Sequence, residues 1–399
     1  MSSKLRPGSW PATGYETHPW VRTGEEIGSR RALLQARGDY HAAVPPFIAE
    51  ARLALSDEVI ALADDASQEL ARFDTEAGLI AAPFASILLR SESASSSEVE
   101  NLTSSAKQVA LAELGESKSG NARLVVANVR AMTAAIALSD QMDEEAIIAM
   151  HDALLRDISP EYVGSWRNEQ VWIGGGAISP HAASFVPPHH LRVPGLMTDL
   201  VAFAERTDIP VLIQTAIAHA QFETIHPFPD GNGRTGRALL QSMLRHGGLT
   251  RNVTVPVSAG LLQDTDAYFR ALTNYRAGDA EAIVVAVSEA SFAAIRNGRA
   301  LVKDIQDSAS RWDEIVVARS DASVHRLKKY LLAQPVVNTK NIASELEISV
   351  VAAQTAVDRL VEVGILTQSS AGRRNRTWQA PEILEALDAF GERARRKRS

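Results

Sequence analysis

Cysteine is absent from this chain of 399 residues. The sequence therefore offers neither a disulfide framework nor a thiolate metal site, and a reducing compartment, the cytoplasm, is the expected location. The chain also lacks an apolar run near the ~20 residues that a membrane span needs, and residues 1–8 lack the apolar stretch of a secretory signal. We therefore expect no contact with a membrane.

Neither sign of charge dominates, because the chain has 41 Lys and Arg residues and 48 Asp and Glu residues. A chain with this balance has no overall field that would attract nucleic acid indiscriminately. Basic residues gather in 393–398, which we expect to be a solvated and disordered tail, and contact with nucleic acid is the alternative.

Helical spacing of apolar residues predicts a mostly α fold with a small β-hairpin at 170–186. Prolines in the first 45 residues exclude long helices there. The serine cluster 91–97 resembles low-complexity sequence or a helix cap. The predicted regions are, in order, an N-terminal arm (1–45), an N-terminal helical region (46–115), a core (116–300), a linker helix (301–320), a winged helix (321–382) and a basic tail (383–399).

The winged helix is predicted from three short helices followed by two extended segments, 365–368 and 376–378. Its would-be recognition helix, 350–363, offers few side chains that could read bases. The wing is better supplied with charge, at Arg373, Arg374 and Arg376. We favour protein interaction or dimerisation for this domain, and a DNA-binding regulator with a nucleotide-sensing core remains the alternative.

The segment His226–Arg237, with the sequence HPFPDGNGRTGR, concentrates residues suited to phosphate chemistry. Gly231 and Gly233 permit a turn that directs backbone N–H groups toward one point, and Asn232 adds side-chain donors. The helix that follows presents its positive N-terminal end to the same point. The segment therefore predicts a phosphate site.

Charged side chains complete this predicted site. Arg234 and Arg237 are three residues apart, so both guanidinium groups can reach neighbouring phosphates from one side of a helix. Asp230 supplies an oxygen ligand suited to Mg²⁺, and His226 can accept a proton from an attacking hydroxyl near neutral pH. These residue types together predict nucleotidyl or phosphoryl transfer.

The segment fits the pattern His-Pro-Phe-x-[Asp/Glu]-Gly-Asn-Gly-Arg-x-x-Arg at every position, which is far from what a chance glycine-rich turn would do. This pattern is the signature of the Fic family (filamentation induced by cAMP), which the sequence plainly resembles from about residue 45 to 295. The resemblance implies a Fic-fold helical core with a β-hairpin flap and the transfer of AMP from ATP to Ser, Thr or Tyr hydroxyls of proteins. It also implies that Mg²⁺ assists.

The resemblance assigns roles to individual residues. His226 would be the base, Asp230 would hold Mg²⁺, and Arg237 would grip the γ-phosphate while Arg234 braces its neighbours. The implied nucleotide-binding set is Phe228, Asp230, Gly231, Asn232, Gly233, Arg234, Thr235, Gly236 and Arg237, with Tyr268, Phe269 and Arg276 bordering the adenine. Gly233 argues against the related death-on-curing kinases, which carry lysine there, and a phosphocholine-transferring variant is excluded only weakly.

Upstream, residues 96–101 fit the pattern [Ser/Thr]-x-x-x-Glu-[Gly/Asn], with Ser96 and Glu100 spaced to share a helix face. This resembles the inhibitory motif of the family's second class, in which Glu100 would pair with Arg237 and misplace ATP. An ordinary surface glutamate is the alternative interpretation. In some relatives the same glutamate helps to remove AMP, so a de-AMPylase is a further alternative.

The hairpin at 170–186 resembles the family's target-binding flap, whose edge could pair with an extended segment of a protein substrate. Self-modification and a homodimer are left open as further partnerships. The sequence does not identify the target protein.

Overall fold

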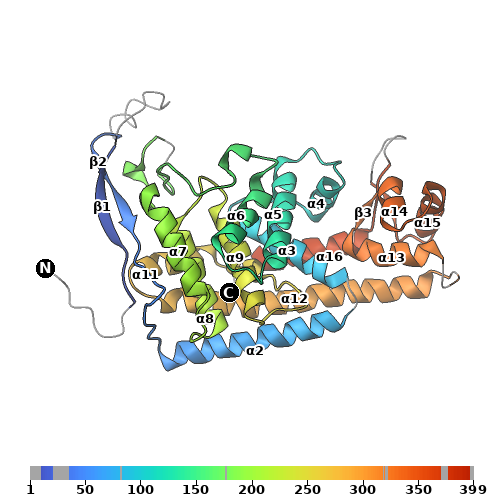
Figure 1. Ribbon diagram of the computed structural model, residues 1–399. Helices are drawn as coiled ribbons and strands as arrows, with labels where there is room; N and C mark the ends of the chain where they lie inside the picture. The colour runs from blue at the N-terminus through green and yellow to red at the C-terminus, as the bar shows by residue number, and fades with distance from the viewer. Residues whose placement is uncertain are drawn as a thin grey trace. The chain divides into compact units, whose positions relative to one another are not determined.

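The structure is a computed structural model that describes residues 10–20, 36–80, 83–175, 178–317, 319, 322–369 and 376–395. Over these residues the chain is mostly helical, with small antiparallel sheets, which confirms the predicted fold class (Figure 1). Arg373, Arg374 and residues 396–398, which the sequence analysis singled out, lie outside the described residues.

The chain divides into two units by the density of its internal contacts, and each unit is assembled from three separate segments. The first unit comprises Met1–Ser67, Ala134–Gly248 and Asp266–Ser288. The second comprises Gln68–Thr133, Leu249–Thr265 and Glu289–Ser399. The helices α2 (Asp57–Leu79), α5 (Gly120–Ala137) and α12 (Glu281–Ile315) each contribute residues to both units. The predicted domain boundaries stay predictions.

The core of the first unit is the helix α8, which is buried along nearly its whole length. It consists mainly of apolar and small residues, as expected of a helix that other elements surround. It packs against α7 and α9, and α9 packs against α6. The helices of this unit are α6 (Glu144–Leu155), α7 (Val193–Ala204), α8 (Val211–Ile225), α9 (Asn232–His246) and α11 (Thr265–Arg276, entering from the second unit), with short turns η1 (Pro160–Tyr162), η2 (Pro180–Ala182) and η3 (His190–Arg192).

Strands β1 (Gly14–Pro19) and β2 (Asp39–Val44) pair antiparallel in the region predicted as an arm. The backbone N–H of Ala43 in β2 donates to the carbonyl of Val186, 3.0 Å away. The predicted flap hairpin is reduced to one antiparallel bridge, Ile173 to Phe185. The glycine turn at Gly174–Gly175 allows this bridge but leaves too few paired residues for regular strands.

The second unit is built around α3, which packs against α10, α13 and α16. A carboxylate fixes α3 to α10: buried Glu92 accepts hydrogen bonds from the Ser258 N–H at 2.8 Å and its hydroxyl at 2.5 Å. The helices and strands that lie wholly in this unit are α3 (Pro83–Val99), α4 (Ala106–Glu113), α10 (Val257–Leu262), α13 (Ser323–Ala333), β3 (Val336–Val337), α14 (Thr339–Glu345), α15 (Val350–Glu362), β4 (Thr367–Gln368), β5 (Trp378–Gln379) and α16 (Pro381–Arg395).

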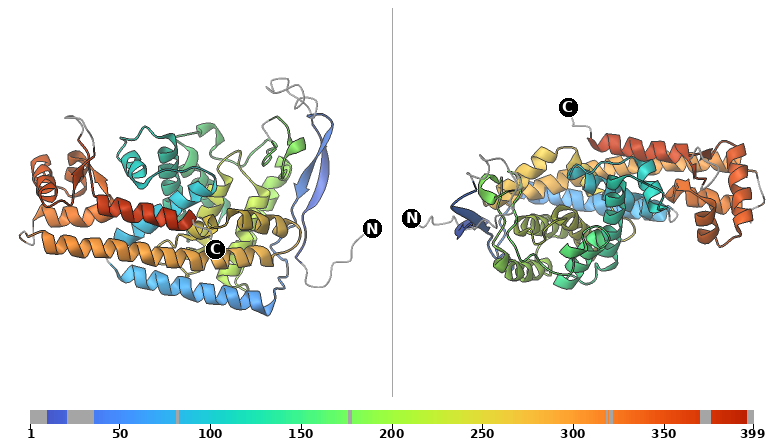
Figure 2. Two further views of the ribbon diagram at one scale, coloured as in Figure 1. Left: turned by 180° about the vertical axis from the view of Figure 1, so that it is seen from behind. Right: turned by 90° about the horizontal axis from the view of Figure 1, so that it is seen from above.

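Two predictions about irregular sequence were wrong. The serine cluster 91–97 is neither low complexity nor a cap, because it lies inside α3 and most of its serines are buried. The expected disordered tail is helical as far as Arg395, since Ile383, Phe390 and Ala394 give α16 a buried face. Arg393 of α16 bonds to Asn297 of α12 at 2.7 Å, and Figure 2 shows the red α16 lying along the orange α12.

The predicted winged helix corresponds to helices α13, α14 and α15 and a sheet with strand order β3-β5-β4. Two polar side chains of α15, the would-be recognition helix, are engaged within it: Gln354 donates to Asp358 at 2.7 Å and Arg359 pairs with Glu362 at 2.5 Å. The start of α15 exposes Val351, which is 77% accessible. Nothing here favours DNA over a protein partner, and the winged helix stays a prediction.

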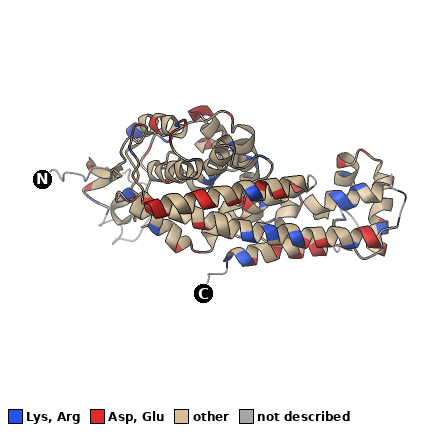
Figure 3. Ribbon diagram, turned by 90° about the horizontal axis from the view of Figure 1, so that it is seen from below, with Lys and Arg blue, Asp and Glu red and all other residues tan. Residues whose placement is uncertain are grey.

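Within the described ranges, no helix combines the length and apolar character that crossing a membrane requires. Charges of both signs are instead interspersed along the long helices (Figure 3). In the second unit, Arg299 of α12 pairs with Glu69 and Glu76 of α2 at 3.3 and 3.0 Å.

Candidate functional site

His226 directly follows the last residue of α8, Ile225, and has a left-handed backbone, with φ 51° and ψ 62°. Its N–H donates to Phe222 at 2.8 Å and so closes the helix. Few non-glycine residues adopt this conformation, which is disfavoured unless the surroundings hold it. The chain therefore turns sharply at His226 and directs the following residues away from the α8 axis.

Arg167 holds this turn. The side chain is 4% exposed and donates hydrogen bonds to backbone carbonyls on two sides of the site. On the helix side, Nε donates to His226 at 2.9 Å and an NH2 group to Ile225 at 3.5 Å. On the flap side it donates to Glu169 at 2.8 Å and Pro188 at 2.5 Å. The last carbonyls of a helix have no partners within it, so Arg167 stabilises the end of α8 and ties it to the base of the flap.

Asn232 holds the loop in shape with its side chain. Its Oδ1 accepts the Phe228 N–H and its Nδ2 donates to the Phe228 carbonyl, both at 2.8 Å. Asn232 is 2% exposed. The sequence analysis assigned the side-chain amide of Asn232 to phosphate. In the structure this amide instead bonds to the backbone of Phe228 and so stabilises the loop.

Beneath the loop lies His151 of α6, which the sequence analysis missed. Its ring stacks on Phe228 with centroids 3.6 Å apart, and its Nε2 lies 3.0 Å from the Asp230 carbonyl oxygen. Burial lowers the pKa of His151 to about 4, so the ring is neutral and donates that hydrogen bond. Phe228 is fully buried, which makes it a support of the loop.

Gly231 provides the start of α9. Its φ of 78° is left-handed, and an added Cβ would lie 2.9 Å from the Leu154 side chain. No side chain caps the helix there. Helix N-termini that follow a glycine turn commonly bind anions through their first-turn N–H groups, as the sequence predicts for α9.

The charged residues of the segment meet at this helix start. Arg234 and Arg237 are both buried, at 3% and 2% exposure. Asp230 is the exposed member, with its Oδ1 accepting the Gly231 N–H at 2.7 Å and its Oδ2 3.7 Å from Arg234. Buried guanidinium groups beside an anion site raise its affinity for phosphate because little water screens them.

The donor set fits Mg²⁺ in one respect. Asp230 presents an exposed carboxylate at the edge of the anion site. Among the described residues there is no cluster of three or more His, Cys, Asp or Glu that could hold a metal by itself. Mg²⁺ commonly binds through one protein carboxylate together with substrate phosphates and water, which is what this site offers.

Burial, together with the positive charges of Arg167 and Arg276, lowers the pKa of His226 to about 3, although a hydrogen bond to the Glu223 backbone opposes the shift. The residue keeps part of its surface accessible to solvent. A lowered pKa leaves His226 neutral near pH 7, the state in which imidazole accepts a proton.

The residues predicted around the adenine differ in their burial and in their contacts. Tyr268 is buried, and its hydroxyl lies 2.8 Å from Nε2 of His219, whose Nδ1 lies 3.0 Å from the Gly236 carbonyl oxygen. Phe269 is 50% exposed. Arg276 lies over the ring of Phe185, 3.8 Å from its centroid. Tyr268 thus supports α9, and Arg276 supports the flap.

Two further residues of the predicted binding set are accounted for by packing. An added Cβ at Gly236 would lie 2.9 Å from the Phe222 ring, so glycine permits the close approach of α8 and α9. Thr235 is fully buried on α9.

The predicted inhibitory residues lie at the end of α3. Ser96 is fully buried in that helix. The sequence analysis expected Glu100 to share a helix face with Ser96. In the structure Glu100 instead follows the last helical residue, Val99. Asn101 has φ 63° and donates to Glu98 at 2.8 Å, while Leu102 donates to Ser97 at 3.0 Å. These two bonds form a Schellman cap, which explains why glycine or asparagine suits position 101.

Comparison with known proteins gives matches over two regions of the chain. The sequence profile of the Fic/DOC family matches residues 141–244, and that of the Fic/DOC N-terminal family matches residues 60–137. The chain is 39% identical over 94 residues to a probable protein adenylyltransferase of Aquifex aeolicus, covering 21% of this chain and 29% of that protein. It is 27% identical over 169 residues to protein adenylyltransferase fic-1 of Caenorhabditis elegans, covering 42% of this chain and 31% of that one.

Among solved structures, a Fic family protein from Desulfovibrio desulfuricans aligns with a TM-score of 0.53 and 22% identity, over 82% of this chain and 97% of that one. That similarity concerns the fold. The matched segments span less than a third of the two adenylyltransferases named above. Residues 60–137 and 141–244 thus match the two regions of the Fic/DOC family in order, and the second region contains the complete loop at 226–237.

Proposed function

We propose that this protein transfers AMP from ATP to a hydroxyl side chain of a protein. The observation that carries the proposal is the loop itself, in which a neutral His226, an uncapped helix start and two buried arginines lie within twelve residues. The relatives that share this domain are named as protein adenylyltransferases, which supports the same chemistry.

In the proposed reaction, the target hydroxyl oxygen forms a bond to the α-phosphorus of ATP as the bond to the β-phosphate oxygen breaks. His226 takes the proton of the hydroxyl. Pyrophosphate leaves with the released electron pair, and the α9 start with Arg234 and Arg237 stabilises its charge. The result is a phosphodiester between AMP and the target.

Asp230 would hold Mg²⁺ against the phosphates, and the ion would neutralise charge that develops on the leaving pyrophosphate. Asp230 itself orients this corner of the site through its bond to the Gly231 N–H.

Replacing Asp230 with asparagine is expected to weaken the apparent affinity for Mg²⁺ by about 10- to 100-fold, because the amide loses the ligand charge. The measurement is AMP transfer from α-³²P-ATP across a Mg²⁺ titration. Asp208→Asn, which removes a surface carboxylate paired with Arg206, is the matched control. Equal Mg²⁺ curves for both variants would rule out the assignment of Asp230.

We further propose that Glu100 restrains the reaction by engaging Arg237, so that ATP binds with its α-phosphate misaligned. Support comes from the motif at 96–101 and from the match to the Fic/DOC N-terminal family that covers the segment ahead of it and around it.

Glu100→Gly is therefore expected to increase AMP incorporation several-fold. The assay compares labelled ATP incorporation in the unmodified protein, in Glu100→Gly and in Glu100→Gly with His226→Ala, which should return to background. Unchanged labelling in Glu100→Gly would contradict the restraint. If Glu100→Gly lost the ability to remove AMP from a labelled target, removal of AMP would be favoured as the reaction of the unmodified protein.

The protein substrate is proposed to bind along the flap. The bridge at Ile173 and Phe185 leaves little regular strand, and β2 already donates to Val186. We therefore expect the N-terminal hairpin β1–β2 to take part in the substrate surface beside the flap.

A further inference from the structure

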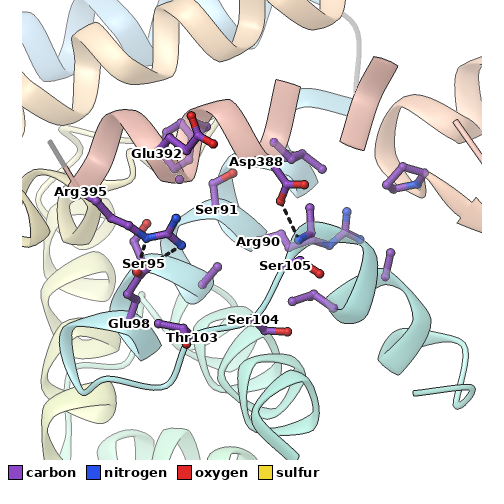
Figure 4. Close-up of a pocket in the computed structure, with 18 residues that line it drawn as sticks. Arg90, Ser91, Ser95, Glu98, Thr103, Ser104, Ser105, Asp388, Glu392 and Arg395 are labelled. Carbon is purple, nitrogen blue, oxygen red and sulfur yellow. Dashed lines mark hydrogen bonds and ion pairs between the residues drawn. The ribbon is translucent and has the colours of Figure 1, made fainter. Parts of the chain in front are cut away.

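A cavity of about 680 Å³ lies in the second unit, between α16 on one side and α3, the 103–105 segment and α4 on the other (Figure 4). This volume is in the range of sites that bind small organic molecules. We call it the α16 cavity. It is lined within one unit of the chain, and the residues of the 226–237 loop are not among its lining residues.

The lining joins apolar and polar groups. Val109, Leu387 and Phe390 supply apolar surface. Ser91 and Ser95 also line the cavity and are only 5% and 4% exposed. Among the described residues, neither serine hydroxyl has a hydrogen-bond partner, unlike that of neighbouring Ser93, which donates to Leu89 at 2.9 Å. The hydroxyl oxygens of Ser91 and Ser95 are not among the buried polar atoms that lack a partner, so each hydroxyl is accessible from the cavity and available to a ligand or to water there.

The charges of the lining select against anions. Arg395 pairs with Glu98 at the surface of the cavity, and Arg90 pairs with Glu113 at 2.8 Å. Both cations are thus neutralised. Two more carboxylates, Asp388 and Glu392, line the cavity, and Asp388 accepts only a neutral N–H, that of Ala106 at 3.0 Å. Lining cations number two and lining carboxylates three, which leaves a net charge of −1.

We propose that the α16 cavity is an effector site for a small organic molecule with an apolar body and an uncharged or cationic hydrogen-bonding head group. The second half of the inference rests on the proposed function, in which Glu100 restrains AMP transfer.

Helix α16, which lines the cavity, bonds to the chain on both sides of the turn that carries Glu100. Arg395 of α16 bonds to Glu98, two residues before Glu100, and Asp388 of α16 caps the N–H of Ala106 at the start of α4. Figure 4 shows both contacts as dashed lines on either side of the 103–105 segment. A ligand between α16 and α3 adds contacts to the arrangement in which both bonds are made, and so favours it. Binding should therefore strengthen the restraint.

The binding half is tested with three probes that share one ring and differ in the head group: benzyl alcohol, benzylamine and benzoate. Ligand-observed NMR with the full chain should detect the first two, with benzoate roughly tenfold weaker or absent. The double variant Ser91→Ala with Ser95→Ala should weaken the first two several-fold. Ser308→Ala, which alters another buried serine of the same unit outside the cavity, should not.

Failure of all three probes to bind, equal binding of benzoate, or equal loss in Ser308→Ala would overturn the site. This readout does not depend on AMP transfer. A negative binding result would therefore count against the cavity site and not against the proposed function. The proposed function would fail if neither the unmodified protein nor Glu100→Gly transferred AMP.

The regulatory half is tested on α16. Arg395→Gln should raise AMP incorporation several-fold, and should add nothing in the Glu100→Gly background if both act through the same turn. Arg393→Gln is the matched control, because Arg393 lies on the same helix but bonds to Asn297 of α12. Benzylamine should lower incorporation in the unmodified protein and not in Glu100→Gly. Additive effects of Arg395→Gln and Glu100→Gly, or equal activation by Arg393→Gln, would contradict the coupling.

Discussion

Replacing His226 with alanine is expected to lower AMP transfer by about 10²- to 10⁴-fold, the usual contribution of a positioned general base. The structure gives the reason, because the imidazole is held neutral at the left-handed end of α8. In the proposed site the phosphates are bound by the start of α9 and not by this side chain. ATP affinity should therefore change little while the rate of transfer collapses.

The measurement is single-turnover transfer from α-³²P-ATP alongside nucleotide binding by calorimetry. His246→Ala is the control, since His246 lies at the far end of α9 and bonds only to the Ser139 carbonyl. Transfer retained in His226→Ala would exclude this residue as the base and, with it, the proposed reaction step.

Arg167→Gln is expected to lower the rate of transfer by about 10²-fold, because a displacement of about 1 Å in a reacting group has an effect of that order. Glutamine cannot reach the carbonyls on both the α8 side and the flap side that arginine bonds simultaneously. ATP affinity should be preserved, while the KM for a protein substrate should rise as the base of the flap loosens. Arg167→Lys should restore part of the rate.

Arg206→Gln is the matched control for Arg167. Arg206 also donates to two backbone carbonyls of the first unit, those of Ala49 at 3.3 Å and Ala51 at 2.7 Å, but away from the loop. Thermal stability should fall in both variants, and the rate of transfer only in Arg167→Gln. Equal losses of rate would show that Arg167 acts through general stability alone.

The pH profile separates these roles further. The positive charge of Arg167 opposes protonation of His226, so its removal raises the pKa of His226. Protonated imidazole cannot act as a base, and the loss of activity on the acid side should therefore begin at a higher pH in Arg167→Gln than in the unmodified protein. An acid limb that stays in place would limit Arg167 to a geometric role.

The sequence identified those parts of the site whose geometry is local. A left-handed glycine, a helix start and two arginines one turn apart are properties of neighbouring residues, so the segment 226–237 could be interpreted directly. Arg167 and His151 could not be found in this way, because each acts on residues far away in the chain, at 225–226 and at 228–230. For Arg167 the only local signal is an arginine next to Trp166, which is too common to be informative.

The same distinction explains the errors in the fold. The serines of α3 were misjudged because their burial depends on helices distant in sequence, α10, α13 and α16. Charge in the last residues suggested a tail, but the apolar side of α16 finds its partners on α3 and α12. Composition alone does not reveal such partners.

The assembly of each unit from three separate segments limits how the protein can be divided experimentally. A fragment that ends at residue 248 would retain the whole loop but lose Tyr268, whose hydroxyl contacts His219 beneath α9. A fragment that begins at residue 134 would lack α3, against which α10, α13 and α16 pack. No single cut releases either unit intact, so expression of an isolated catalytic segment should yield poorly folded protein, and studies of the reaction need the chain in full.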